Sequence, residues 1–102
     1  MTNVTQIKQE ILRTDDGRVA STITLNNERS TTRYYDSAGI MAAAIMSLRN
    51  ILSHARESSV VELQTNVFSL KTCLSDETSY TSKHRDSLLE LISERNITLI
   101  FK

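Results

Sequence analysis

The chain has 102 residues, with 12 lysines and arginines against 12 aspartates and glutamates, so its formal net charge is zero. Affinity for nucleic acids comes mostly from neutralised phosphates, so this balance argues against tight, sequence-independent binding to DNA or RNA. One cysteine, Cys73, excludes an internal disulfide and a multi-cysteine metal site. No apolar run approaches the roughly 18 residues of a membrane span. We expect one cytoplasmic domain, residues 1–102, with no cofactor and no membrane contact.

Three alternating runs open the chain, at residues 4–13, 19–25 and 28–36, and predict three β-strands. Gly17 follows an aspartate between the first two runs, which indicates a tight turn because glycine adopts positive φ. Asn26-Asn27 indicates a second turn, since asparagine tolerates the left-handed region. The third run has β-branched and aromatic but no aliphatic residues, which is typical of an edge strand. The runs predict an antiparallel meander.

A long helix is predicted next, capped by Asp36 or Ser37 and ended by Ser58-Ser59. Its apolar residues recur at the i, i+3, i+4 and i+7 spacing of one helical face, which should pack on the sheet. We expect Ile45, Leu48 and Leu52 to be buried against the sheet. The apolar positions are Ile40, Met41, Ala44, Ile45, Leu48, Ile51, Leu52 and Ala55.

The opposite face of the first turns of this helix is apolar as well, at Ala42, Ala43 and Met46. A helix that is apolar nearly all round is usually covered on both sides. The cover is either another helix of the same chain or another subunit. These three residues are therefore a candidate partner-binding surface.

The rest of the chain predicts a strand, two helices and a last strand. Residues 60–65 form a short strand that follows a helix, so it should lie parallel to the first strand. Asn66 should cap a short helix, and Thr81 or Ser82 should cap the last helix, with Asn96 at its C′ position. Residues 97–102 are apolar on both faces, which suits a covered strand. The fold class is α+β with a mixed sheet.

This element order resembles the ribonuclease H-like fold over essentially the whole chain. In that family the first helix begins with a glutamate and a Leu-Met-Ala-Ala-like run, where this chain has Gly39-Ile40-Met41-Ala42-Ala43. The family's fourth strand ends in a Thr-Asp-Ser-like turn, where this chain has Gln64-Thr65-Asn66-Val67. The resemblance implies a five-stranded mixed sheet in the order 3-2-1-4-5, with helices on its faces.

The same resemblance implies that catalysis is lost. The family's nucleases hold two divalent ions with clustered carboxylates. The helix glutamate falls on Gly39 and the strand-end aspartate on Asn66, and neither residue carries a carboxylate. The family's last carboxylate belongs to a helix after the fifth strand, whereas this sequence stops at Lys102. Only Glu10 would remain, on the first strand, so we expect no ribonuclease activity and no bound metal.

Five other residues carry reactive side chains. Asp15 and Asp16 are candidate metal ligands, although an Asp-Asp-Gly sequence is usually turn chemistry. His54 and His84 are candidate general bases, although each lies on the polar side of a helix without a nearby serine or cysteine. Cys73 is a candidate nucleophile, although a small buried helix residue is the more ordinary role.

The third strand offers a second candidate partner surface at Arg29, Arg33 and Tyr34, unless these are the ordinary charges of an edge strand. We expect a non-catalytic protein-binding or regulatory domain, of adaptor or inhibitor type, that binds another protein or a second copy of itself. The first alternative is a nucleic-acid-binding module that uses the Arg-bearing meander. The second is a residual metal-dependent enzyme that uses Glu10 and the two aspartates of the hairpin.

Overall fold

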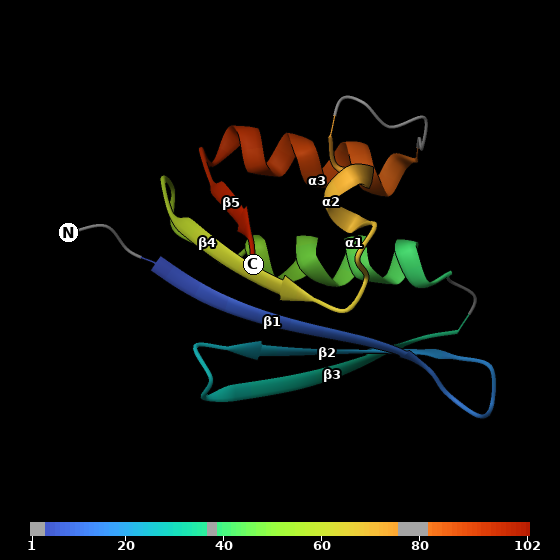
Figure 1. Cartoon of the computed structure of the whole chain (residues 1–102). Coiled ribbons are helices and arrows are strands. Elements are labelled where there is room, and N and C mark those ends of the chain that lie inside the picture. The colour runs from blue at the N-terminus through green and yellow to red at the C-terminus, as the bar shows by residue number, and fades with distance from the viewer. Residues whose placement is uncertain (1–3, 37–38, 76–81) are drawn as a thin grey trace.

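The computed structural model describes residues 4–36, 39–75 and 82–102. The elements follow one another in the predicted order (Figure 1). They are β1 (Val4–Arg13), β2 (Val19–Leu25), β3 (Arg29–Tyr35), α1 (Ile40–Leu52), β4 (Val60–Thr65), α2 (Leu70–Cys73), α3 (Lys83–Glu94) and β5 (Thr98–Phe101).

The strands form one mixed sheet in the order β3-β2-β1-β4-β5, which confirms the predicted order. β1 and β2 are antiparallel, as are β2 and β3, so the meander is present. β4 lies parallel to β1, and β5 lies parallel to β4. β3 forms one edge of the sheet, as its composition predicts.

The tight turns lie where the sequence places them. Gly17 has a φ of 86° between β1 and β2, a conformation that a residue with a Cβ rarely adopts. Asn26 and Asn27 have φ values of 51° and 60° between β2 and β3. Asn96, with a φ of 53°, ends α3 at the predicted C′ position, and Ser82 caps its start by accepting a hydrogen bond from the Arg85 N–H at 3.0 Å.

The helices cover one face of the sheet only (Figure 1). On β1, Ile7, Gln9 and Ile11 are buried on the helix side, whereas Lys8 and Glu10 between them are exposed. The expectation of helices on its faces is therefore wrong for the second face, at least in the described ranges. The physical reason is that α3 stacks on α1 and adds a layer there, instead of crossing to the other side.

The helix α1 lies between the sheet and α3, which confirms that both of its sides are covered. Ile45, Leu48 and Leu52 are almost fully buried, as predicted. The buried core comprises Ile7, Ile11, Val19, Ile23, Ala43, Ala44, Ile45, Leu48, Leu52, Val61, Leu63, Val67, Leu70, Cys73, Leu88, Leu91 and Ile97.

The bounds of α1 differ from the prediction at both ends. Gly39 holds the N-cap position without a side-chain hydrogen bond, so Asp36 does not cap the helix, and Ser37 lies outside the described residues. The helix ends at Leu52 because the backbone tightens there: the His54 N–H donates to the Ile51 carbonyl at 3.2 Å. The helix therefore stops before Ser58-Ser59.

Two further expectations are wrong. Asn66 does not cap α2, whose N-cap is Ser69, because the Asn66 side chain is engaged by β1 instead. β5 is not covered on both faces. Thr98 and Ile100 are exposed, with Ile100 at 40% exposure, because β5 is an edge strand and its outward face has no helix over it.

Candidate functional site

Gly39, Asn66 and Glu10 correspond to the carboxylate positions of the ribonuclease H-like family that the sequence resembles. In this chain they do not form a carboxylate cluster. Gly39 precedes α1 and has open space where a Cβ would lie, so a side chain would fit there. Glu10 lies on the open face of the sheet, opposite the face that α1 covers, and its carboxylate contacts the Lys8 Nζ at 3.4 Å. Glu10 therefore cannot combine with groups at the start of α1.

Asn66 extends the pairing of β4 with β1 through its side chain. Its Oδ1 accepts from the Ile11 N–H at 2.8 Å, and its Nδ2 donates to the Ile11 carbonyl at 2.9 Å. The Asn66 N–H also donates to the Gln9 carbonyl at 3.3 Å. An aspartate could accept but not donate in this geometry. The backbone of β1 thus requires one donor and one acceptor at this position, and the asparagine amide supplies both.

A buried polar network under α1 holds the centre of β1. Gln9 is 1% exposed, and its Nε2 donates to the Ala44 carbonyl at 2.9 Å and to the Ser47 Oγ at 3.0 Å. Its Oε1 accepts from the Thr65 Oγ1 at 2.7 Å. The network fixes α1 against β1 and β4. The sequence already contains its signal, a glutamine between two inward isoleucines, but the partners come from two other elements, α1 and β4.

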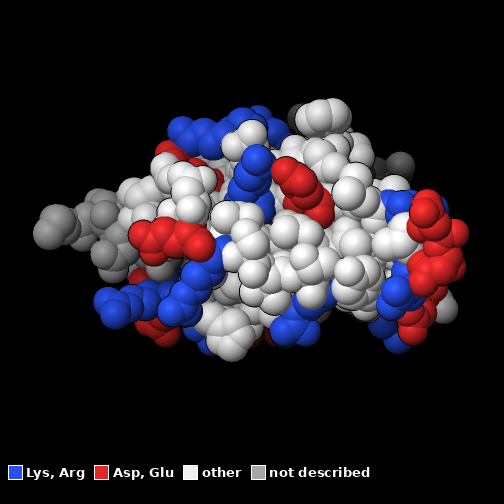
Figure 2. All heavy atoms as spheres, turned by 90° about the horizontal axis from the view of Figure 1, so that it is seen from below, with Lys and Arg blue, Asp and Glu red and all other residues white. Residues whose placement is uncertain are grey.

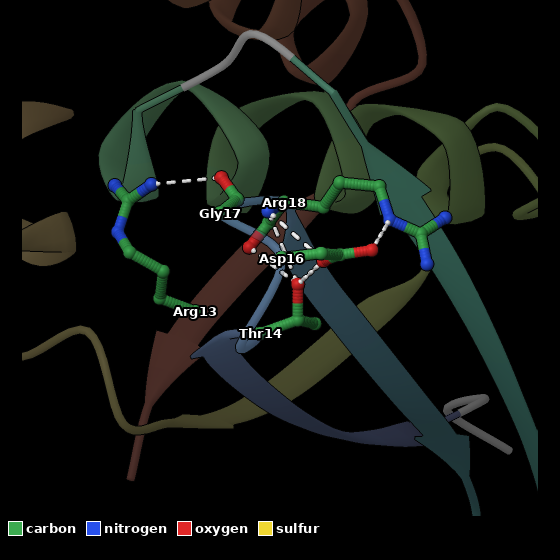
Figure 3. Close-up of polar contacts among 5 residues, drawn as sticks. All are labelled: Arg13, Thr14, Asp16, Gly17 and Arg18. Atoms are coloured by element: carbon green, nitrogen blue, oxygen red, sulfur yellow. Dashed lines mark hydrogen bonds and ion pairs between the residues drawn. The ribbon is translucent and has the colours of Figure 1, made fainter.

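Asp16 of the first hairpin stabilises the turn (Figure 3), whereas Asp15 is exposed to solvent. The Asp16 carboxylate accepts from the Thr14 hydroxyl and pairs with the Arg18 guanidinium at 2.9 Å. The hydrogen bond from Thr14 comes first among the causes that lower the pKa of Asp16, with Arg18 adding to it. Within residues 4–36, 39–75 and 82–102, no group of three or more His, Cys, Asp or Glu side chains could hold a metal ion.

The remaining reactive residues lie apart from one another. His84 is exposed on α3, and His54 is exposed just after α1. Cys73 is buried at the end of α2, and this burial raises the pKa of its thiol, although the charge of Arg85 acts in the opposite direction. A buried thiol with a raised pKa is a poor nucleophile.

The strip Arg29, Arg33 and Tyr34 is divided by the sheet. Arg33 pairs with the buried Ser21 across β2 and β3, so it lies on the helix side. Arg29 lies four residues before Arg33 on β3, so its side chain is on the same side of the sheet, where it is exposed. Tyr34 lies on the open face, where its ring stacks under the Arg18 guanidinium at 4.6 Å. The three residues are therefore not one contact surface.

The second face of α1 contributes less surface than expected. Ala43 is fully buried and is part of the core, so it cannot contact a partner. Ala42 and Met46 are half-buried. α3 packs alongside α1, and the Arg49 Nε donates to the Ser87 Oγ at 2.6 Å between the two helices. The cover that the sequence predicts over this face is thus supplied within the chain.

The open face of the sheet has no covering element in the described ranges. Figure 2 shows the side of the molecule that lies below the strands in Figure 1, where charges of both signs lie beside one another. Lys8 pairs with Glu10, and the Lys102 Nζ lies 2.9 Å from the Glu62 carboxylate. Leu12 is 62% exposed on the same face.

Two hollows on the helix side of the sheet share Ile51 and His54 in their linings. The larger, of about 490 Å³, lies beside the end of α1, next to the starts of β1 and β4. The smaller, of about 220 Å³, lies between α1 and the strands β2 and β3, and Arg33 and Asn50 line it. No sequence pattern indicates these hollows, because they depend on where α1 ends.

The smaller hollow contains a buried hydroxyl without a hydrogen-bond partner. Ser21 is 1% exposed, and its Oγ has no partner among the described residues. On the other wall, the Ser47 hydroxyl is fully engaged by Gln9 and by the Ala44 carbonyl. An unpaired buried hydroxyl is destabilising, which makes Ser21 the residue of this region whose role the packing does not explain.

The chain matches no protein-family model and no curated protein sequence. Among the residues that the structure describes, none of the helices has the length and apolarity that a membrane crossing requires.

Proposed function

We propose that the chain is a non-catalytic, protein-binding domain of the ribonuclease H-like fold that binds through the open face of its sheet. The fold is supported by the strand order and by the position of α1 on one face. The observation that carries the function is the absence of any covering element over that face in the described ranges. A second copy of the chain is one such partner, because the net charge is zero and a symmetric dimer is the commonest assembly.

The apolar residues of the open face support a protein partner. Leu12, Tyr34 and Ile100 are 62%, 54% and 40% exposed, and they come from β1, β3 and β5. Exposed apolar side chains spread over a polar, mixed-charge surface are typical of non-obligate interfaces, in which aromatic side chains supply much of the affinity.

The charges of the same face argue against nucleic acid. Lys8, Lys102 and Arg18 are each paired with a carboxylate, at 3.4, 2.9 and 2.9 Å. A phosphate backbone needs cations whose charge is not already neutralised. The alternative is that the meander binds nucleic acid through Arg29 and Arg33. Tyr34 cannot contribute to that surface, because it lies on the other face of the sheet.

The absence of catalysis is part of the proposal and is supported by the geometry of the resembled site. Both polar side-chain atoms of Asn66 are hydrogen-bonded to the Ile11 backbone, and Glu10 points away from α1. We expect millimolar Mg²⁺ or Mn²⁺ neither to raise the melting temperature nor to elicit cleavage of an RNA–DNA hybrid. Cleavage by the purified, unmodified chain would contradict this part.

The experiment compares the unmodified chain with Leu12→Lys and Tyr34→Lys, which place charges on the open face. Arg29→Gln, on the other side of the sheet, is the matched control. Light scattering after size exclusion measures self-association, and capture from the native host followed by identification measures foreign partners. We expect both open-face variants to lose the dimer or the captured partner, while the control and the thermal stability stay unchanged.

Two results would overturn the proposal. The first is a complex that survives both lysine substitutions, because the binding surface would then lie elsewhere. The second is salt-dependent retention on DNA or RNA that Arg29→Gln and Arg33→Gln weaken, which would favour the nucleic-acid alternative.

A further inference from the structure

The two hollows on the helix side of the sheet share Ile51 and His54 in their linings, and we call them together the groove. The part called the apolar end contains Ile7, Leu25 and Val61, with Thr5, Arg56 and Ser59 beside them. The part called the polar end contains Ser21, Arg33 and Asn50, with Ile23 beside them. The groove lies on the opposite side of the sheet from the open face and so is independent of the protein-binding proposal. The larger hollow, of about 490 Å³, has the volume of a small-molecule site, whereas the smaller, of about 220 Å³, is below that range.

The permanent charges of the groove have one sign. Arg33 and Arg56 line it, and no aspartate or glutamate is among its described lining residues. None of the ion pairs within the described ranges involves these two side chains. In a chain with as many acidic as basic residues, this local excess is a feature of the groove.

The polar end brings two hydrogen-bond donors together. Ser21 and Arg33 are cross-strand partners in β2 and β3, so their side chains leave the sheet next to each other on the helix side. The Ser21 hydroxyl is buried, lines the hollow and has no partner in the described part of the chain. A guanidinium beside a donor hydroxyl is a suitable arrangement for a carboxylate, which accepts several hydrogen bonds.

The C-terminal end of α1 repels an anion in the groove less strongly than a helix end with unsatisfied carbonyls would. The C-terminal carbonyls of a helix carry partial negative charge when they are unsatisfied. The carbonyls of Arg49, Ile51 and Leu52 accept hydrogen bonds from the turn that follows. The Asn50 carbonyl accepts from the Ser53 hydroxyl at 2.6 Å.

We infer that this groove binds a small amphipathic carboxylate. The carboxylate lies at the polar end, where the Arg33 guanidinium and the Ser21 hydroxyl donate to it. The apolar body extends past Ile51 into the larger hollow, against Ile7 and Leu25. The cost of leaving the Ser21 hydroxyl buried and unpaired is then offset in the bound state.

Three probes separate the parts of this site: octanoate, octanamide and acetate. Octanoate has both the carboxylate and the apolar body, octanamide lacks the charge, and acetate lacks the body. We expect octanoate to bind the full chain at low millimolar concentration or better, and the other two to bind about tenfold more weakly or worse. Backbone amide shifts in a nuclear magnetic resonance titration should move at Ser21, Thr31 and Ile51.

Two variants and a control test the residues. Arg33→Gln should weaken octanoate about tenfold, toward the affinity of octanamide. Ser21→Ala should weaken octanoate while the melting temperature of the free protein stays the same or rises, which a merely structural role would not produce. Arg29→Gln is the control, because Arg29 lies on the same strand and side but does not line the groove.

Several outcomes would overturn the inference. If octanamide binds as tightly as octanoate, the groove does not recognise an anion. If acetate matches octanoate, the apolar end contributes nothing. If Arg29→Gln weakens octanoate as much as Arg33→Gln, or if the shifts gather at Lys8 and Tyr34 on the open face, the site lies elsewhere. If octanoate does not bind at low millimolar concentration, the inference of a carboxylate site is also wrong.

Discussion

The two faces of the sheet are built from the same strands, but the helices bury one face and leave the other exposed. On the helix side, Ile7, Ile11 and Val61 are at most 3% exposed beneath α1. On the other side, Lys8, Glu10 and Leu12 are exposed and no described element covers them. Because successive residues of a strand point to opposite faces, the middle of β1 carries a buried and an exposed set in alternation.

This difference separates residues that specify the fold from residues that are available for binding. A substitution on the helix side changes the packing of α1, whereas a substitution on the open side changes only a surface. Neighbouring residues on one strand therefore make matched pairs in which backbone, strand and sequence position are nearly constant. The largest expected contrast comes from such a pair on β1.

Ile11→Ala should cost about 2–5 kcal/mol of unfolding free energy, because it removes a buried aliphatic side chain from a packed core. Leu12→Ala, one residue later and 62% exposed, should change stability by no more than about 0.5 kcal/mol. Urea denaturation at low micromolar concentration measures both. A similar cost for the two would mean that a partner covers the open face. A cost of Leu12→Ala that grows with protein concentration would indicate that this partner is a second copy.

Asn66→Asp tests whether the end of β4 is fixed by its backbone contacts. The carboxylate would face the Ile11 carbonyl where an amide now donates at 2.9 Å, so we expect a loss of about 1–3 kcal/mol at pH 7. A protonated carboxyl can donate again, so folding favours the protonated form and raises the pKa of the new side chain. The loss should therefore be small in acid and grow as the pH rises through that pKa.

Gln64→Glu is the control for the added charge, because Gln64 is exposed on β4 and no hydrogen bond joins its side chain to the backbone of β1 in the described part of the chain. It should leave stability nearly unchanged over the same pH range. If Asn66→Asp is as mild as Gln64→Glu at pH 7, the two bonds to Ile11 contribute little, and a strand-end carboxylate is compatible with this scaffold.

The sequence predicted the parts of the fold that depend on local pattern. Strand alternation, the positive-φ turns at Gly17 and Asn26-Asn27, and the helix-to-strand crossover together determine the strand order. The end of α1 was predicted several residues too late because its polar C-terminal residues still fit a helical period. Hydrogen bonds of the turn decide that end, and they depend on tertiary contacts such as the Arg95 side chain on the Ala55 carbonyl.

The candidate sites depended more on space than on pattern. The period-2 alternation separates Arg33 from Tyr34, so their division between the two faces was available from the sequence. The burial of Ala43 was not, because it depends on how closely α3 approaches α1. The groove around His54 likewise requires the relative position of α1 and four strands, which no local pattern contains.

Two buried serines provide a smaller contrast within the helix side. Ser21→Ala removes a hydroxyl without a described partner, so stability should stay the same or rise by up to about 1 kcal/mol. Ser47→Ala removes a hydroxyl that Gln9 and the Ala44 carbonyl both engage, so stability should fall by about 0.5–1.5 kcal/mol. Thermal denaturation of both variants measures the difference, and a loss of stability in Ser21→Ala would show that its hydroxyl has a structural partner.

The smallest effect is expected on the open face, at the ion pair between Glu62 and Lys102. The hydrogen bond from Lys102 is the first cause that lowers the pKa of Glu62, and partial burial acts against it. A lowered folded-state pKa means that the pair stabilises the fold above the ordinary glutamate pKa and that this contribution is lost as the pH falls through the lowered value. Glu62→Gln should therefore reduce the melting temperature slightly at pH 7 and low salt. The reduction should disappear in about 1 M salt, where exposed charges are screened, and in acid. A reduction that persists under both conditions would mean that Glu62 stabilises the sheet through packing and not through charge, and that the open face is more enclosed than its exposed residues indicate.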